Sequence, residues 1–249
     1  ILMPHGEAPL VRAALVLNHG YDGTGVEGMN TFAEAMHRRG TKIPADEQML
    51  AIAGYYRESR AGAARMLSAG GSSGNLDAVL SRLRRETGEV DYVMANKREW
   101  INRGVSMSKG TSYRGDPDAW ASRLTSERLW GDHVMGRWGD RAYYERMRDW
   151  DQSMVEAWYK RKYQPSNATL LVVGKLSDME QAEAVVQEFF GGWKPAPGAE
   201  IGEITPPAPP THKSERKVLL FDKPNSTQTE VTMACAVEPW TNENYLVGK

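Results

Sequence analysis

The sequence has few cysteines, almost no net charge and no long apolar run, so its composition does not assign it to a functional class. Its 249 residues include one cysteine, Cys235, so no disulfide can form within the chain. Lys and Arg (31) nearly balance Asp and Glu (32), and the formal net charge of −1 gives no reason to expect nucleic acid as a partner. No apolar run approaches the roughly 20 residues that span a bilayer. The apolar fraction of 41% and charged fraction of 25% are typical of a soluble globular protein.

Residues that commonly hold metals or phosphates are also sparse. The five histidines are His5, His19, His37, His133 and His212, and no two have the i, i+3 or i+4 spacing of a helix-borne metal site. Surface or loop histidines are the favoured interpretation over a metal site assembled from distant ones. The glycine-rich run at residues 70–74 lacks the Gly-Lys-Ser/Thr ending of a phosphate-binding loop, so it predicts a tight turn.

Hydrophobic periodicity predicts alternating strands and helices. Alternation predicts a strand at residues 10–17, two short strands at 55–60 and 63–68, and a strand at 169–173 whose continuous apolar character is typical of a sheet interior. Two apolar stripes predict helices, and their members are Met29, Phe32, Ala33 and Met36 in the first and Leu76, Val79, Leu80 and Leu83 in the second. Further helices are expected near 93–107, 119–129 and 150–162. The interleaving indicates an α+β or α/β layer.

A last helix is expected after a capping box at residues 177–180, with Met179, Ala182, Val186 and Phe189 on one side and Phe189 buried under the sheet. Residues 194–211 then hold six of the thirteen prolines and are predicted to be a linker. Beyond it, strands are expected at 217–222 and 231–237. The predicted organisation is therefore a domain at 1–193, a linker at 194–211, and the truncated beginning of a second, similar domain at 212–249.

Several segments, in one order, resemble the insulinase-type zinc peptidases, the M16 family that includes pitrilysin and the mitochondrial processing peptidases. The most specific is Tyr163–Gly174 followed by Glu188–Trp193, which is similar to the family's YxPxNxxLvvvG … yFGxW block. Weaker similarities lie at Gly25–Thr41, Asp116–Pro117 and Gly131–Arg137, and at Phe221–Pro224 in the second half. The resemblance implies a two-layer α+β half-domain, with a mixed sheet packed against helices, followed by the start of a second similar half-domain.

Active members carry an inverted zinc motif, His-x-x-Glu-His, on a helix, and a third glutamate ligand on a later helix. Gly40-Thr41 sets the register here and puts Thr31, Glu34 and Ala35 where His, Glu and His should stand. The third ligand falls at Ser108. By this resemblance all three zinc ligands are lost and only the base-equivalent Glu34 remains, which we interpret as a polar residue on a helix edge. No catalytic, metal or cofactor residue is therefore expected in this chain.

The functional hypothesis is a non-catalytic subunit or half of an M16-type zinc peptidase. Its expected partners are a zinc-bearing M16 subunit or domain, which supplies the zinc, and an unfolded peptide, with neither nucleic acid nor a membrane span involved. The alternatives are a pseudo-peptidase scaffold and, less favoured, an active zinc endopeptidase with unrecognised ligands. The compartment is left open: periplasmic with a signal peptide absent from this sequence, cytoplasmic, or organellar.

Overall fold

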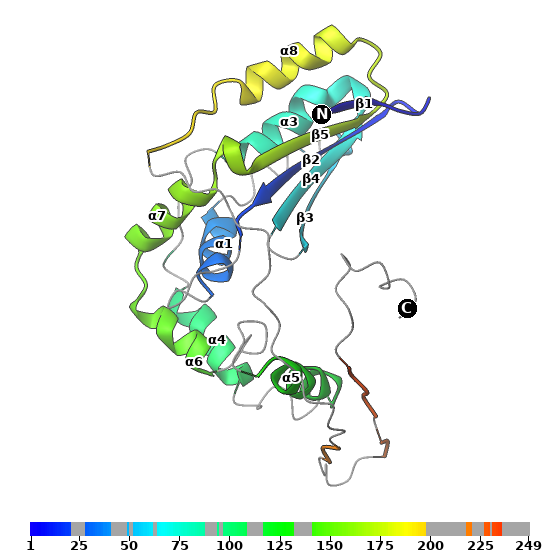
Figure 1. The fold of residues 1–249 in the computed structure, drawn as a ribbon. Coiled ribbons are helices and arrows are strands. Elements are labelled where there is room, and N and C mark those ends of the chain that lie inside the picture. Colours follow the sequence, from blue (N-terminus) through cyan, green and yellow to red (C-terminus); the bar gives the residue numbers. More distant parts are fainter. Residues whose placement is uncertain are drawn as a thin grey trace. The chain divides into compact units, whose positions relative to one another are not determined.

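A computed structural model describes residues 1–20, 28–40, 49, 52–61, 64–87, 94, 97–108, 117–131, 141–197, 218–220, 227–229 and 231–235. The chain divides into two compact units, of which one comprises residues 1–97 and 149–206 and the other residues 98–148 and 207–249. The first unit contains a five-stranded sheet with its helices, and the described part of the second is mainly helical (Figure 1).

The sheet of the first unit is mixed. Its strand order is β1 (Leu2–Pro4), β5 (Ala168–Gly174), β2 (Leu10–Asn18), β4 (Ala64–Ser72) and β3 (Tyr55–Ala61). The β1–β5 pair is parallel and the other pairs are antiparallel. The four predicted strands of this region correspond to β2, β3, β4 and β5, and β5 lies in the sheet interior as expected. The predicted α+β class is confirmed.

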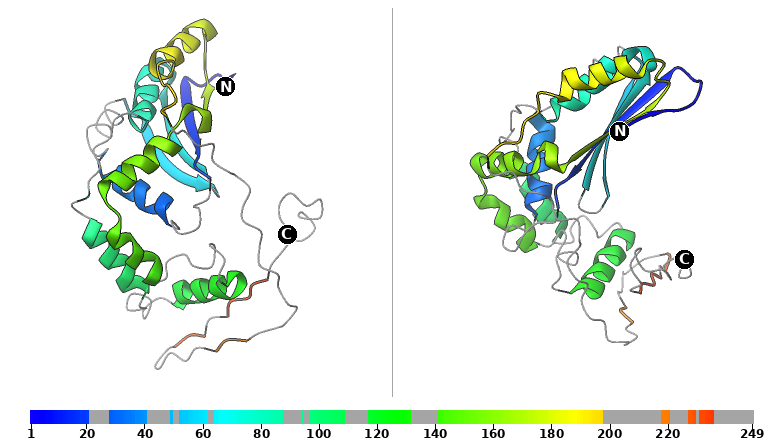
Figure 2. Two further views of the ribbon diagram at one scale, coloured as in Figure 1. Left: turned by 60° about the vertical axis from the view of Figure 1, so that its left-hand side comes forward. Right: turned by 45° about the horizontal axis from the view of Figure 1, so that its top comes forward.

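One face of this sheet is covered by helices. Along β2, Val11, Ala13, Leu15 and Leu17 are at most 3% exposed, whereas the intervening residues are half-buried or exposed. This alternation follows from the two-residue repeat of a strand, which sends successive side chains to opposite faces. Helices α3 (Leu76–Arg85) and α8 (Met179–Phe190) lie on the same side of the sheet (Figure 2), which makes the two predicted layers.

The apolar stripe of α3 fills the space between the layers. Its buried residues include Leu76, Val79, Leu80 and Leu83, the four that the sequence pattern identifies. Each such side chain contributes about 1.5–3 kcal/mol when it is fully removed from water. The first apolar stripe is likewise confirmed in α1 (Met29–Gly40), where Met29, Phe32, Ala33 and Met36 are at most 4% exposed.

Helix α8 differs from its prediction in two respects. Its N-cap is Asp178, whose carboxylate accepts a hydrogen bond from the backbone N–H of Gln181 at 3.0 Å, so the predicted capping box beginning at Ser177 is wrong by one residue. Phe189 is only half-buried, so its predicted burial under the sheet is also wrong. Helix α8 packs beside α3 and meets the sheet at the short strand β1, and only Ala182 of its apolar stripe is buried.

Helix α1 packs against α7 (Gln152–Lys162) beside the end of β2. The ring of Phe32 contacts Trp150 edge-on at a centroid distance of 5.3 Å. The indole N–H of Trp158 donates to the Asn30 side chain at 2.8 Å. Asp151 caps α7 by accepting from the backbone N–H of Met154 at 3.0 Å. These contacts fix the helix that carries the base-equivalent position.

Gly174 ends β5 in a conformation that side-chain-bearing residues rarely adopt, with φ +143°. A Cβ at this position would overlap the carbonyl oxygen of Leu10 and lie 2.8 Å from the Cα of Val11. The glycine therefore allows β5 and the start of β2 to approach closely at the edge of the pairing.

The second unit contains α4 (Lys97–Ser108) from Arg98 onward, α5 (Pro117–Trp130) and α6 (Arg141–Arg146), of which α4 and α5 are predicted. Trp100 and Tyr144 pack edge-on, with ring centroids 5.8 Å apart. Residues 218–220 and 231–235, the described parts of the two strands predicted after the linker, form no strand, and Val218 and Met233 are over 90% exposed. A strand requires a paired neighbour as well as a local pattern.

Most of the predicted linker lies outside the described residues, and the division at 194–211 stays a prediction. Across the described ranges, no helix has the length and apolar character needed to cross a bilayer.

Candidate functional site

The residues at the zinc-motif positions have the following places in the fold. Thr31, Glu34 and Ala35 lie on α1, where Thr31 is half-buried and the other two are buried. Ser108 is the last residue of α4, in the second unit. Glu34, interpreted above as a polar residue on a helix edge, is only 6% exposed, so it is a buried polar residue.

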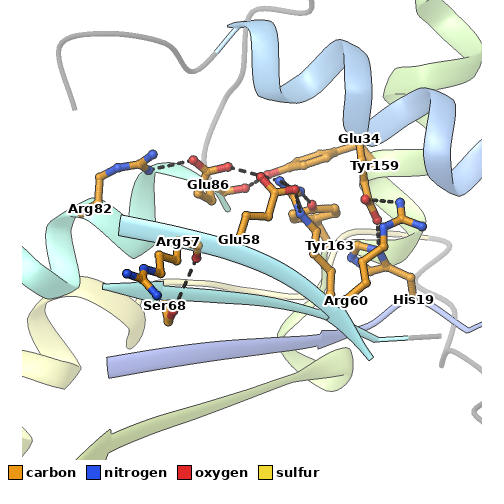
Figure 3. Close-up of polar contacts among 11 residues, drawn as sticks. His19, Glu34, Arg57, Glu58, Arg60, Ser68, Arg82, Glu86, Tyr159 and Tyr163 are labelled. Atoms are coloured by element: carbon orange, nitrogen blue, oxygen red, sulfur yellow. Dashed lines mark hydrogen bonds and ion pairs between the residues drawn. The ribbon is translucent and has the colours of Figure 1, made fainter. Parts of the chain in front are cut away.

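Both carboxylate oxygens of Glu34 are engaged. His19 Nδ1 lies 3.2 Å from Oε1, and the Arg60 guanidinium donates to Oε2 (Figure 3). His19 directly follows β2 and Arg60 lies on β3. The carboxylate therefore ties α1 to two strands of the sheet and serves as the acceptor for two donors.

The protonation of this pair follows from burial and from the neighbouring charges. Burial lowers the pKa of His19 below its ordinary value of 6.5, and this effect outweighs the opposing influence of Glu34. The pKa of Glu34 is also lowered from its ordinary value: burial alone would raise it, but the hydrogen bond from His19 and the charges of Arg65 and Arg60 prevail. At neutral pH a neutral His19 therefore donates its Nδ1–H to an ionised Glu34.

A larger buried polar network adjoins the pair. Arg65, which is 1% exposed, donates from Nε to Glu58 at 2.9 Å and also donates to the Tyr163 hydroxyl. Glu86 accepts from Arg82 at 2.7 Å. The further contacts are the Tyr159 hydroxyl donating to the Glu86 carbonyl oxygen, and the Arg82 guanidinium 3.5 Å from the Tyr56 ring centroid.

The charges of the network balance. Arg60, Arg65 and Arg82 carry three positive charges, and the carboxylates of Glu34, Glu58 and Glu86 carry three negative ones. The Arg65 pKa stays raised despite burial, because Glu58, Glu34 and Glu86 outweigh the desolvation. Buried charges persist only when they are paired in this way. The network therefore anchors β3, β4, α1 and the end of α3 to one another.

The sequence argument identifies Glu34 but misses the partners that define its environment. One sequence signal for them exists: Glu58 and Arg60 alternate with Arg57 and Ser59 along a strand, so one of its two faces carries an acid and a base together. Inward-pointing charged residues of this kind are a common feature of edge strands, and β3 is an edge of the described sheet.

These residues do not fit a zinc ion. Thr31 and Ala35 offer no imidazole, and the Glu34 oxygens are taken by His19 and Arg60. A zinc site needs three good donors with an open position, and the general base beside it needs a free oxygen to accept a proton. Within the described part of the chain, no three or more His, Cys, Asp or Glu side chains are grouped so that they could hold a metal.

Comparison with known proteins gives the following relationships. The model of the family described as the peptidase M16 inactive domain matches residues 149–249. This range contains Tyr163–Gly174 and Glu188–Trp193, the two parts of the most specific segment in the sequence. No curated protein sequence matches the chain.

Three solved structures illustrate the fold relationship. The peptidase M16 inactive domain from Pseudomonas fluorescens is 16% identical, with a TM-score of 0.64 over 84% of this chain and 51% of that one. A protease from Helicobacter pylori is 15% identical, with a TM-score of 0.66 over 82% and 50%. The periplasmic protease PqqL from Escherichia coli is 17% identical, with a TM-score of 0.63 over 83% and 24%.

The present chain thus spans about half the length of the first two structures and about a quarter of the third. At these identities the likeness shows the fold. Together with the family match, it confirms the resemblance to the M16 peptidases that the sequence motifs predict.

Proposed function

We propose that this chain, a member of the M16 peptidase family or one half of such a member, is a non-catalytic unit that completes the peptide-binding chamber of a zinc-bearing partner. The partner is a separate subunit in a heterodimer or the other half of a longer protein. In either case the zinc, the activated water and the general base belong to the partner. The present chain contributes a wall that holds unfolded peptide.

The engagement of Glu34 is the observation that carries this proposal. A general base must hold a free oxygen within reach of the proton that it removes. Here one oxygen lies against His19 and the other against Arg60, while the neighbouring ligand positions are Thr31 and Ala35. Without a metal to lower the pKa of water, a lone carboxylate has no suitable substrate at neutral pH. The carboxylate is therefore assigned to holding α1 on the sheet.

The sheet supports a peptide-holding role. β3 lies at an edge of the described sheet, where an extended peptide can add as a further strand. Main-chain hydrogen bonds would supply affinity without demanding a particular sequence. A well-positioned substrate lowers the barrier of the reaction by several kcal/mol, but only where the chemistry is available across the chamber.

Co-purification of the native full-length protein tests the proposal. A zinc-bearing relative with an intact His-x-x-Glu-His motif, either bound as a second chain or joined in the same one, is expected. The pure chain should cleave an unfolded peptide negligibly, and addition of the zinc-bearing unit should restore cleavage. Glu34→Gln, assayed per folded molecule, should leave the restored rate unchanged.

Two outcomes contradict the proposal. The first is chelator-sensitive cleavage by the pure chain, which would indicate an active peptidase with unrecognised ligands. The second is a stable complex that contains no zinc-bearing unit and cleaves nothing, which would favour the scaffold alternative.

A further inference from the structure

One ring nitrogen of the buried His19 is not used by the pair that it forms with Glu34. His19 Nδ1 faces Glu34 at 3.2 Å, whereas Nε2 has no hydrogen-bond partner among the described residues, although the side chain is only 2% exposed. The imidazole contacts two aromatic rings, Trp158 at a centroid distance of 5.1 Å and Tyr163 at 4.7 Å. A proton on Nε2 would therefore create a buried N–H donor without an acceptor, which costs free energy.

The charges around His19 also oppose its protonation. Within the described part of the chain, the charged groups that act on it are Glu34 on α1, Arg60 on β3 and Arg65 on β4, and the Tyr163 ring, which follows α7, is a further titratable neighbour. Arg60 already pairs with Glu34 (Figure 3). The three arginines of the network are matched by three glutamates, so a proton on His19 would add a fourth positive charge without a carboxylate of its own. A buried charge of that kind is strongly disfavoured.

Much of the polar attachment of α1 to the strands runs through this pair. The main packing partner of α1 is α7, whereas α3 packs on both β2 and β4. Glu34 gives α1 its hydrogen bonds to Arg60 on β3 and to His19, directly after β2. Asn30 adds a bond to the carbonyl oxygen of Gly20 at 2.9 Å. A change of charge on His19 therefore acts more directly on α1 than on the layer that α3 forms.

We infer that His19, Glu34 and Arg60 form a pH-sensitive latch, which holds α1 on the sheet at neutral pH and favours its local opening in mildly acidic solution. In the open state His19 is hydrated and can bind a proton. Burial lowers the pKa of His19 in the closed state below its ordinary value of 6.5, so the proton is taken up mainly on opening. The pKa of Glu34 is lowered as well, so its carboxylate stays ionised over the same range.

Amide hydrogen exchange of the full chain, followed by mass spectrometry, tests the inference. After correction for the pH dependence of intrinsic exchange, the protection of residues 29–36 should fall by up to about 30-fold between about pH 7.5 and about pH 5, since each pH unit below 6.5 favours the open state by up to tenfold. Urea at concentrations too low to unfold the chain separates local from global opening. It should hardly affect exchange in residues 29–36 and should speed exchange in α3, because global unfolding exposes far more surface.

Two variants and a control assign the effect to the latch. His19→Asn keeps a side-chain N–H that can donate to Glu34 but binds no proton, so the protection of residues 29–36 should no longer depend on pH. Arg60→Gln leaves the charge of Glu34 to a protonated His19 and should therefore reduce the fall in protection severalfold. His5→Asn makes the first change at an exposed histidine after β1 and should keep the full fall. Each comparison is made across pH within one variant, so a uniform loss of stability does not imitate the result.

Three results overturn the inference. Protection of residues 29–36 that stays constant across this pH range shows that His19 does not control α1. A fall that survives His19→Asn assigns the pH dependence to another group. Equal responses to urea in residues 29–36 and in α3 show that α1 opens only when the whole chain unfolds. None of these results bears on the proposed function, which is decided by cleavage with a zinc-bearing unit.

Discussion

Replacement of Glu34 by glutamine measures how much the buried carboxylate holds the fold together. In the native protein it accepts from His19 and from Arg60, and its side chain is only 7% exposed. Hydrogen bonds to charged groups contribute about 1.5–3 kcal/mol each, and neutral ones about 0.5–1.5 kcal/mol. Glutamine keeps one acceptor oxygen and loses the charge.

The partners differ in their access to water, which sets the expected size of the effect. His19 is 2% exposed by its side chain and cannot be rehydrated, whereas Arg60 is 34% exposed and can recover part of its solvation. We therefore expect Glu34→Gln to lower the free energy of unfolding by about 1–2 kcal/mol. Glu34→Ala should cost about 3 kcal/mol, because it leaves the buried His19 N–H without an acceptor and opens a void.

Urea unfolding followed by far-ultraviolet circular dichroism measures these losses. Glu183→Gln, on the exposed side of α8, makes the same chemical change without a buried partner and should stay within about 0.5 kcal/mol of the unmodified protein. A double-mutant cycle with Arg60→Gln should give a coupling of about 1 kcal/mol. Glu34→Gln indistinguishable from Glu183→Gln, or a coupling near zero, would refute the assignment of Glu34 to fold stability.

Three further predictions follow from the same geometry. Stability should fall as the pH drops below 6.5, because burial lowers the His19 pKa in the folded protein and the unfolded chain therefore binds the proton first. The free energy of unfolding should change by up to about 1.4 kcal/mol per pH unit. The lowered pKa of Glu34 adds a further loss of stability below pH 4.5, and urea midpoints that do not change with pH would contradict both effects. Gly174→Ala should cost more than about 1 kcal/mol, since a Cβ would overlap the Leu10 carbonyl at φ +143°, whereas Gly192→Ala, with nothing within 4 Å, should be nearly neutral in the same unfolding assay. Elemental analysis after metal-free purification should find far less than one zinc per chain, because Thr31, Ala35 and Ser108 stand at the ligand positions; a stoichiometric ion that is lost on mutation near residues 31–35 would overturn that assignment.

Elements with a strong and local apolar pattern could be predicted from the amino-acid sequence. The alternation of β2 and the stripes of α1 and α3 identify the buried side chains, because a fixed rise and rotation per residue convert spacing into a shared face. The segment from Tyr163 to Gly174, followed by Glu188–Trp193, carries the resemblance to the M16 peptidases, and the family model that matches residues 149–249 contains both parts of it.

Which elements pack together, and which residues each face contacts, could not be predicted from local sequence. Phe189 lies on the apolar stripe of α8, but that helix packs beside α3 and reaches only the short strand β1 of the sheet, and no local pattern shows how much of the stripe its neighbours cover. The described residues of the segments beyond the predicted linker have a strand pattern but form no strand, because pairing needs a neighbour that local sequence cannot specify. Glu34 meets His19 and Arg60 across separations of 15 and 26 residues. The motif position shows what chemistry Glu34 has lost, but its present role depends on the charges that the folded sheet and helices bring to it from distant parts of the chain.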